Sequence, residues 1–179
     1  VSNIDKTAPT SIINYSTEEK TNRDVTVIIE TNEEIQAVEG WELFESRKLR
    51  KIYDKNTTET VKIKDQAGNE ITETIRVTNI DKIAPTATVN YSTKEETKEN
   101  VTVTIESNEE IQGIEGWTLS RDMKSLTKTY NRNTTEKILI KDLAGNETTV
   151  NIVIDNIIVL IGDLDENEKI DIGDLLLLK

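Results

Sequence analysis

The residues best suited to chemistry gather in an acidic segment near the C-terminus. Oxygen-bearing side chains occupy positions 1, 3, 5, 9 and 12 of a 12-residue segment; they are Asp163, Asp165, Asn167, Asp171 and Asp174. Position 7 is Lys169, which would contribute its backbone carbonyl oxygen. Alternate spacing lets a curled loop turn every second side chain onto one ion, and carboxylate, amide and carbonyl oxygens suit calcium. The segment therefore predicts a calcium loop with these six ligands.

Apolar residues within and after this loop extend the pattern. Ile170 lies between ligand positions, where it can anchor the loop to a core, and the leucines at 175–178 predict the start of a helix. This arrangement is typical of an EF-hand-like loop. Asp174 stands where an EF-hand usually has Glu, and Gly162 immediately precedes the loop. With these features, segment 157–179 resembles the first of the two loop–helix segments of a dockerin.

The dockerin resemblance implies a partner as well as an ion. Dockerins attach the proteins that carry them to cohesin-bearing partners, so the resemblance implies calcium-dependent attachment to a cohesin through the complete module. The family has glycine at position 6 of the loop, whereas this chain has Glu168. A residue with a Cβ in a left-handed turn costs about 1–2 kcal/mol, so we expect weaker calcium binding than in a standard loop.

Carboxylates nearer the N-terminus suggest a second calcium site. Asp81 lies at the junction of two sequence repeats. Glu33, Glu34 or Asp65 of the preceding repeat could join it as hard oxygen ligands that rigidify the junction. The alternative is that Asp5 and Asp81 only brace turns ahead of the first strand of each repeat.

The composition excludes several classes of function. The 179 residues include no cysteine and no histidine, which rules out thiolate nucleophiles, disulfides and the usual zinc sites. A carboxylate pair is the one catalytic arrangement left, and the acids fall mostly at solvent-facing strand positions, so the chain is predicted not to be an enzyme. A net charge of −12 disfavours nucleic acid and anionic lipid as partners. No apolar run approaches the roughly 18 residues that membrane insertion needs.

The chain repeats itself with an offset of 76 residues, which becomes 77 after an insertion near Met123. Segments 1–10, 32–36 and 40–41 return as 77–86, 108–112 and 116–117, and 65–69 returns as 142–146. The sequence therefore predicts one domain at 1–78, a second at 79–156 and the partial dockerin-like segment at 157–179. A third copy is expected to begin at Ile154 and to be cut short, and Val1 falls within the pattern, as in a fragment of a longer protein.

Alternation of apolar and polar residues predicts the strands of each repeat. The alternation is clearest at 25–29, 61–63, 101–105, 138–140 and 150–154, where β-branched residues are common. Gly68 with Asn69, and Gly145 with Asn146, mark turns between successive strands. No helical period is sustained before the C-terminus. The predicted fold class is all-β, with two tandem β-sandwich domains.

The repeated motifs resemble bacterial Ig-like repeats. They are the opening Asp-Lys-x-Ala-Pro-Thr, the central Asn-Glu-Glu-Ile-Gln followed by Gly-Trp, and the closing Asp-x-Ala-Gly-Asn. The resemblance covers about residues 1–156 and implies seven-strand-type Ig-like sandwiches in an extracellular protein, secreted or associated with the cell surface or cell wall. It implies a spacer or scaffold function without catalysis. The alternative is an adhesin-type module whose repeats bind a glycan or a host protein.

A comparison of side chains between the two repeats bears on this choice. Trp41 and Trp117 could form an aromatic platform for a sugar, but one buried tryptophan per small sandwich is commoner, so both are assigned to the core. Exposed positions differ, as in Glu42 against Thr118, while the expected core and turns match. That pattern favours a scaffold over a duplicated ligand site. The basic stretch 47–51 is interpreted as a solvated edge strand.

Overall fold

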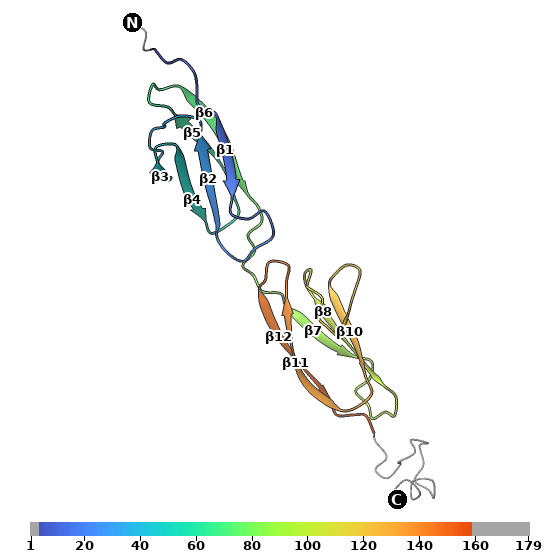
Figure 1. The fold of residues 1–179 in the computed structure, drawn as a ribbon. Helices are drawn as coiled ribbons and strands as arrows, with labels where there is room; N and C mark the ends of the chain where they lie inside the picture. Colours follow the sequence, from blue (N-terminus) through green and yellow to red (C-terminus); the bar gives the residue numbers. More distant parts are fainter. Residues whose placement is uncertain (1–3, 159–179) are drawn as a thin grey trace, which may run out of the picture. The chain divides into compact units, whose positions relative to one another are not determined.

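The described part of the chain is all-β, as predicted. The computed structural model describes residues 4–158, which form twelve strands and no helix (Figure 1). Among these residues there is consequently no helix that could cross a membrane. The chain divides into two compact units, residues 4–84 with 143–146, and residues 85–142 with 147–158.

Each unit contains six strands. Those of the first unit are β1 (Ser11–Tyr15), β2 (Val25–Thr31), β3 (Glu42–Glu45), β4 (Lys48–Tyr53), β5 (Thr57–Lys64) and β6 (Glu70–Val77). Those of the second are β7 (Ala87–Tyr91), β8 (Val101–Ser107), β9 (Thr118–Leu119), β10 (Ser125–Tyr130), β11 (Thr134–Lys141) and β12 (Glu147–Ile154). The expected seven-strand arrangement is not reached in the described residues. An isolated bridge between Ile35 and Asp65 stands beside β5 where a further strand would lie.

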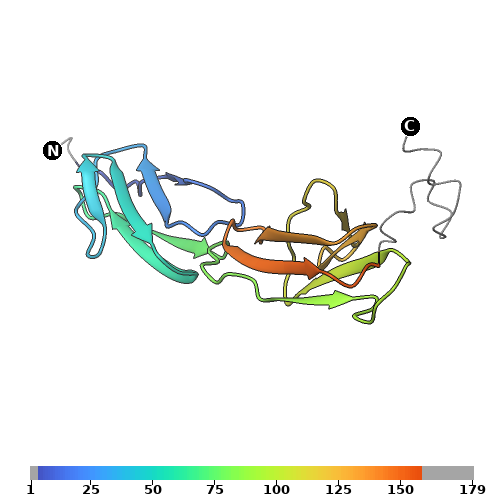
Figure 2. The same cartoon turned by 90° about the horizontal axis from the view of Figure 1, so that it is seen from below.

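The strands of each unit form two antiparallel layers. In the first unit the four-stranded sheet has the order β1-β2-β4-β3, and β5 pairs with β6 as a separate hairpin. In the second unit the orders are β7-β8-β10-β9 and β11-β12, and Figure 2 shows the same strands from below. Side chains from both layers of a unit share one core; Val27 and Ile29 of β2 and Ile63 and Ile75 of the hairpin are fully buried in the first. Period-two alternation thus places one face of each strand in the core.

The turn between β5 and β6 depends on a buried carboxylate. The Asn69 backbone N–H donates to Asp65 Oδ1 at 2.8 Å, and Asn69 Nδ2 donates to Oδ2 at 2.7 Å. Gly68 has a φ of 94°, which a residue with a Cβ rarely adopts, and Gly145 repeats it at 92° in the second unit. The predicted turns at these glycines are therefore confirmed.

Three residues from separate parts of the chain hold it where it leaves each unit, and together they are called the exit latch. They are Thr21, Asn56 and Ile80 in the first unit, and Thr97, Asn133 and Ile157 in the second. The Ile80 N–H donates to Asn56 Oδ1 at 2.8 Å, and Asn56 Nδ2 donates back to the Ile80 carbonyl at 3.0 Å. Ile80 also forms a parallel bridge with Thr21, and its side chain is buried in the first core.

The exit latch shifts the structural boundary relative to the sequence repeat. The sequence repeat restarts at Val77, yet Ile80 still belongs to the first core, and the compact unit extends to Ala84. In the same way Asn133 holds Ile157 in the second unit. Residues 154–157, which were expected to open a third copy, close the second unit instead.

A polar cluster joins the two layers beside the core tryptophan. Lys51 Nζ lies 2.8 Å from both carboxylate oxygens of Glu59, and the Tyr53 hydroxyl donates to Glu59 at 2.8 Å. Burial raises the pKa of Glu59, but hydrogen bonds from Lys51 and Tyr53 outweigh this effect and hold the pKa below its ordinary value. Trp41 packs edge-on against Tyr53, with ring centroids 6.3 Å apart. Lys128, Tyr130 and Glu136 repeat the contacts in the second unit.

Two interpretations of single segments can now be compared with the structure. Trp41 is buried and Trp117 packs against the second core, so the assignment of both tryptophans to the core is confirmed. The assignment of 47–51 to an edge strand is wrong, because β4 lies between β2 and β3. Glu42 and Glu45 of β3 pair with Arg50 and Lys48, which explains how a basic strand fits inside the sheet.

Candidate cation site

The C-terminal calcium loop lies outside the described residues. All six predicted ligands, Asp163, Asp165, Asn167, Lys169, Asp171 and Asp174, belong to this part of the chain, as does the helix expected to follow them. Both therefore stay predictions from the sequence.

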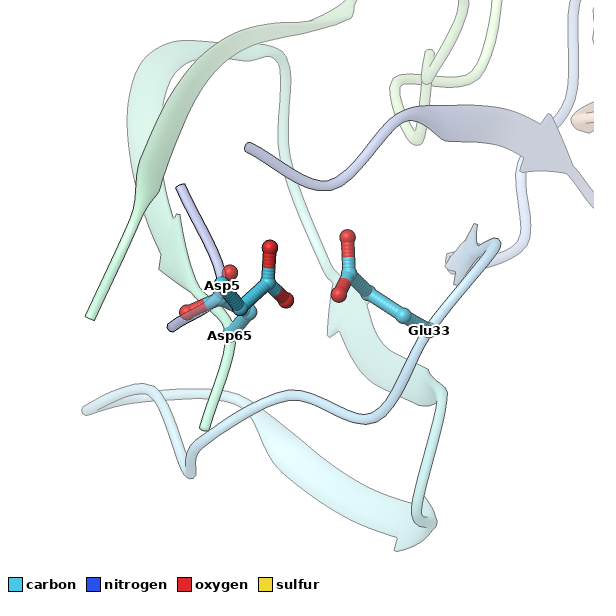
Figure 3. Close-up of side chains that lie close together, drawn as sticks. All are labelled: Asp5, Glu33 and Asp65. Atoms are coloured by element: carbon cyan, nitrogen blue, oxygen red, sulfur yellow. The ribbon is translucent and has the colours of Figure 1, made fainter. Parts of the chain in front are cut away.

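Three carboxylates do meet in the first unit, but they are not the set expected at the junction. Oxygen atoms of Asp5, Glu33 and Asp65 lie within 4.8 Å of one another (Figure 3). We call these three residues the entry cluster. Asp81, which was expected to join Glu33 and Asp65, lies instead at the other end of the unit, where its N–H donates to the Thr21 carbonyl. The partners expected for Asp81 were wrong, because the strands carry Asp81 to the exit end of the unit and Glu33 to the entry end.

Each member of the entry cluster is placed by a different element. Asp5 lies in the segment that leads to β1, Glu33 follows β2, and Asp65 follows β5. In the sheet Ser11, which begins β1, pairs with Thr31, which ends β2, so these segments meet at one end of the sandwich. The Asn69 side chain also donates to the Asp5 carbonyl at 3.4 Å, which ties the entering chain to the β5–β6 turn.

Asp5 braces a turn, as the alternative interpretation predicted. Its Oδ1 accepts the Thr7 backbone N–H at 2.9 Å. Asp81 does the same for the Ile83 N–H at 3.1 Å. Such a turn is a common role for aspartate ahead of a strand and needs no ion. Asp5 therefore has a structural role whether or not the entry cluster also binds a cation.

The electrostatics of the entry cluster differ between its members. Desolvation raises the pKa of Glu33, and the negative charges of Asp5 and Asp65 raise it further. Asp65 is only 1% exposed. Its burial acts to raise its pKa, but hydrogen bonds from Asn69 and from the turn backbone lower the pKa below its ordinary value. The carboxylate form of Asp65 is therefore stabilised by the turn, whereas the carboxylate form of Glu33 is destabilised by its surroundings.

The donor set of the entry cluster suits a hard divalent cation. All three residues offer carboxylate oxygens, and a cation would offset both the desolvation and the repulsion by Asp5 and Asp65 that raise the pKa of Glu33. In the second unit Glu109 and Asp142 occupy the equivalent positions and also approach within 4.8 Å. Sequence analysis identified Glu33 and Asp65 as candidates but missed Asp5 as their neighbour, because no local pattern shows that the segment before β1 lies beside the ends of β2 and β5.

Shallow cavities occur at equivalent places in both units. One of about 200 Å³ is lined by Tyr15, Thr17, Glu18, Arg76, Thr78 and Asn79. Its counterpart, of about 280 Å³, is lined by Tyr91, Thr93, Lys94, Val153, Asp155 and Asn156. Both are smaller than the roughly 300–1,000 Å³ of typical ligand pockets, and their charged residues differ between the units. They give no sign of a duplicated small-molecule site.

Comparison with known proteins adds no relative. No protein-family model matches the chain, and neither the curated proteins nor the solved structures gave a significant match. The Ig-like and dockerin-like assignments therefore rest on the residues quoted above.

Proposed function

We propose that the chain is a non-catalytic, extracellular spacer made of Ig-like sandwiches, from a secreted or cell-surface protein. Its C-terminal segment is the opening calcium loop of a dockerin-like module that, when complete, attaches to a cohesin-bearing partner. The alternative, an adhesin-type module that binds a glycan or host protein, receives no specific support from the cavities described above.

One observation carries the spacer proposal: the chain enters and leaves each unit at opposite ends. In the first unit it enters beside Glu33 and the β5–β6 turn, and it leaves through the exit latch beside Thr21 and Asn56. Strands of eight residues, such as β5 and β6, span about 26 Å between the two ends. A unit with opposite ends adds its own length to a chain, whereas a unit with adjacent ends does not.

A spacer lengthens in proportion to its number of repeats. We expect a chain with a second copy of residues 77–153 inserted after position 153 to have a larger maximum dimension. The increase, measured by small-angle X-ray scattering, should be about the length of one unit, roughly 25–35 Å. The comparison chain carries a Gly/Ser segment of the same number of residues, a flexible coil of roughly 45–50 Å root-mean-square span, so its increase should be larger and its scattering should show the flexibility that a folded repeat lacks. An unchanged maximum dimension after insertion of the folded repeat would contradict the spacer function.

The calcium loop is tested by titration of calcium into the chelator-treated chain. Isothermal calorimetry should detect binding that disappears in the Asp163→Ala, Asp174→Ala double variant, because two of the carboxylate ligands are lost. The matched control is Glu33→Gln, which keeps the Asp65 carboxylate that the β5–β6 turn needs and should leave this binding in place. Heat that survives the double variant and disappears in Glu33→Gln assigns calcium to the entry cluster and contradicts the loop assignment. Absence of any heat contradicts calcium binding altogether.

A further inference from the structure

Three isoleucines lie on the outer face of the four-stranded sheet of the first unit. In β2 the fully buried Val27 and Ile29 face the core, so Ile28 between them faces outward. Ile12 of β1 is 65% exposed and Ile52 of β4 is 61% exposed. Single exposed apolar residues are common on protein surfaces, but several apolar side chains gathered on one face are a feature of interaction surfaces.

The strand register places these isoleucines in one diagonal row. Asn14 pairs with Ile28, so Ile12 lies diagonally beside Ile28 across the β1–β2 ladder. Thr26 pairs with Ile52, so Ile52 lies diagonally beside Ile28 across the β2–β4 ladder. Diagonal neighbours on a sheet are about 7–8 Å apart, within reach of shared contact with one partner. Ile12, Ile28 and Ile52 are called the isoleucine row.

Phe44 extends the isoleucine row toward the β3 edge. The register between β3 and β4 shifts between Leu43 and Glu45, and such a bulge re-aims the side chain within it. Phe44 is 37% exposed, and the Arg50 guanidinium lies 5.2 Å from its ring centroid. Because Arg50 pairs with Ile28 in the sheet, the aromatic ring and the isoleucine row belong to one surface.

The second unit has the same sheet without this surface. The residues equivalent to the isoleucine row are Thr88, Thr104 and Thr129. The Thr129 hydroxyl hydrogen-bonds to that of Thr102 at 3.0 Å, which makes the face more polar. The fold therefore does not require isoleucine at these positions, and the apolar row of the first unit calls for another explanation.

The charges around the isoleucine row favour a second copy of the chain as the partner. Lys48 pairs with Glu30 and Glu45, and Arg50 pairs with Glu42, so two cations face three acids and the surface carries about −1 of the total −12. Two copies repel each other least where each is nearly neutral. A two-fold contact also brings the cations of one copy toward the acids of the other, since an isologous interface is self-complementary.

We infer that the outer face of the β1-β2-β4-β3 sheet, centred on Ile12, Ile28 and Ile52, is a self-association surface for two copies of this chain. Two sheets of equal twist pack face to face with their strands about 30° apart, which suits identical faces. Four strands of four to seven residues, about 4.8 Å apart, give a face of about 350 Å², or roughly 700 Å² over both copies. That area is below the roughly 1,200 Å² at which stable specific interfaces begin, so the dimer is weak and depends on concentration.

Sedimentation velocity of the full chain, with chelator present, tests this surface. The weight-average sedimentation coefficient should rise with protein concentration, and more steeply at higher salt, because salt screens the repulsion between chains of charge −12. The triple variant Ile12→Thr, Ile28→Thr, Ile52→Thr should dimerise at least about tenfold more weakly, because it removes most of the buried apolar area. Threonine already occupies the equivalent strand positions of the second unit, so the variant should keep its fold, which circular dichroism verifies.

Two controls distinguish association through this surface from nonspecific association. Ile83→Thr removes an isoleucine that is 74% exposed but lies outside the strands, and it should leave the dimerisation constant unchanged. Thr88→Ile, Thr104→Ile, Thr129→Ile in the second unit should increase association. A wild-type chain that stays monomeric at every concentration and salt level overturns the inference. So does a folded Ile12, Ile28, Ile52 triple variant that associates as strongly as the wild type.

Discussion

Ile29→Ala is expected to lower the free energy of unfolding of the first unit by about 3–4 kcal/mol. The substitution removes buried apolar contacts and leaves a cavity in a small core. Ile29 is fully buried in the first core cluster, which contains no residue of the second. Small sandwiches have only a few kcal/mol of stability to lose. Urea unfolding of Ile29→Ala should therefore show two transitions. Compared with the wild type, the transition of the first unit should move to a lower urea concentration and that of the second unit should stay unchanged.

Ile105→Ala is the matched control for this result, because Ile105 occupies the equivalent position in the second core. It should shift the other transition by a similar amount. Ile12→Ala, at an exposed position of the first unit, should shift neither by more than about 0.5 kcal/mol. A single transition that moves equally for Ile29→Ala and Ile105→Ala would show that the two units do not unfold separately.

Asn56→Ala should destabilise the first unit by about 2 kcal/mol. The substitution removes both hydrogen bonds that hold Ile80 in the exit latch and leaves the Ile80 N–H without its acceptor. Hydrogen exchange should then show faster exchange at the Ile80 amide than in the wild type, in addition to an earlier urea transition. Asn133→Ala should do the same to the second unit only. Unchanged protection at Ile80 would show that the Thr21 bridge and apolar burial hold the segment without Asn56.

The sequence predicted the parts of the fold that depend on local pattern. Strands with clear alternation, such as 25–29 and 150–154, were found because one face of each is buried. The turns at Gly68 and Gly145 were found because their backbone conformation favours glycine. β3 was not predicted, because it has only four residues and a bulge that interrupts its alternation.

The candidate site was only partly predictable, because it depends on which segments meet at one end of the sandwich. Glu33 and Asp65 were named, yet Asp5 was missed, because only the fold shows that the segment ahead of β1 lies beside the ends of β2 and β5. The exit latch was missed for the same reason. Asn56 is an ordinary loop asparagine until the chain returns 24 residues later and places Ile80 against it.

The placement of entry and exit at opposite ends also determines how a unit bears tension. When the chain is pulled from both sides, the force on β1 and on β6 runs along the strands. The hydrogen bonds between β1 and β2, and between β5 and β6, lie perpendicular to that direction. All hydrogen bonds of a ladder are then sheared together instead of opening one after another. The topology that lets each unit add its length to the chain therefore also makes the unit resist stretching.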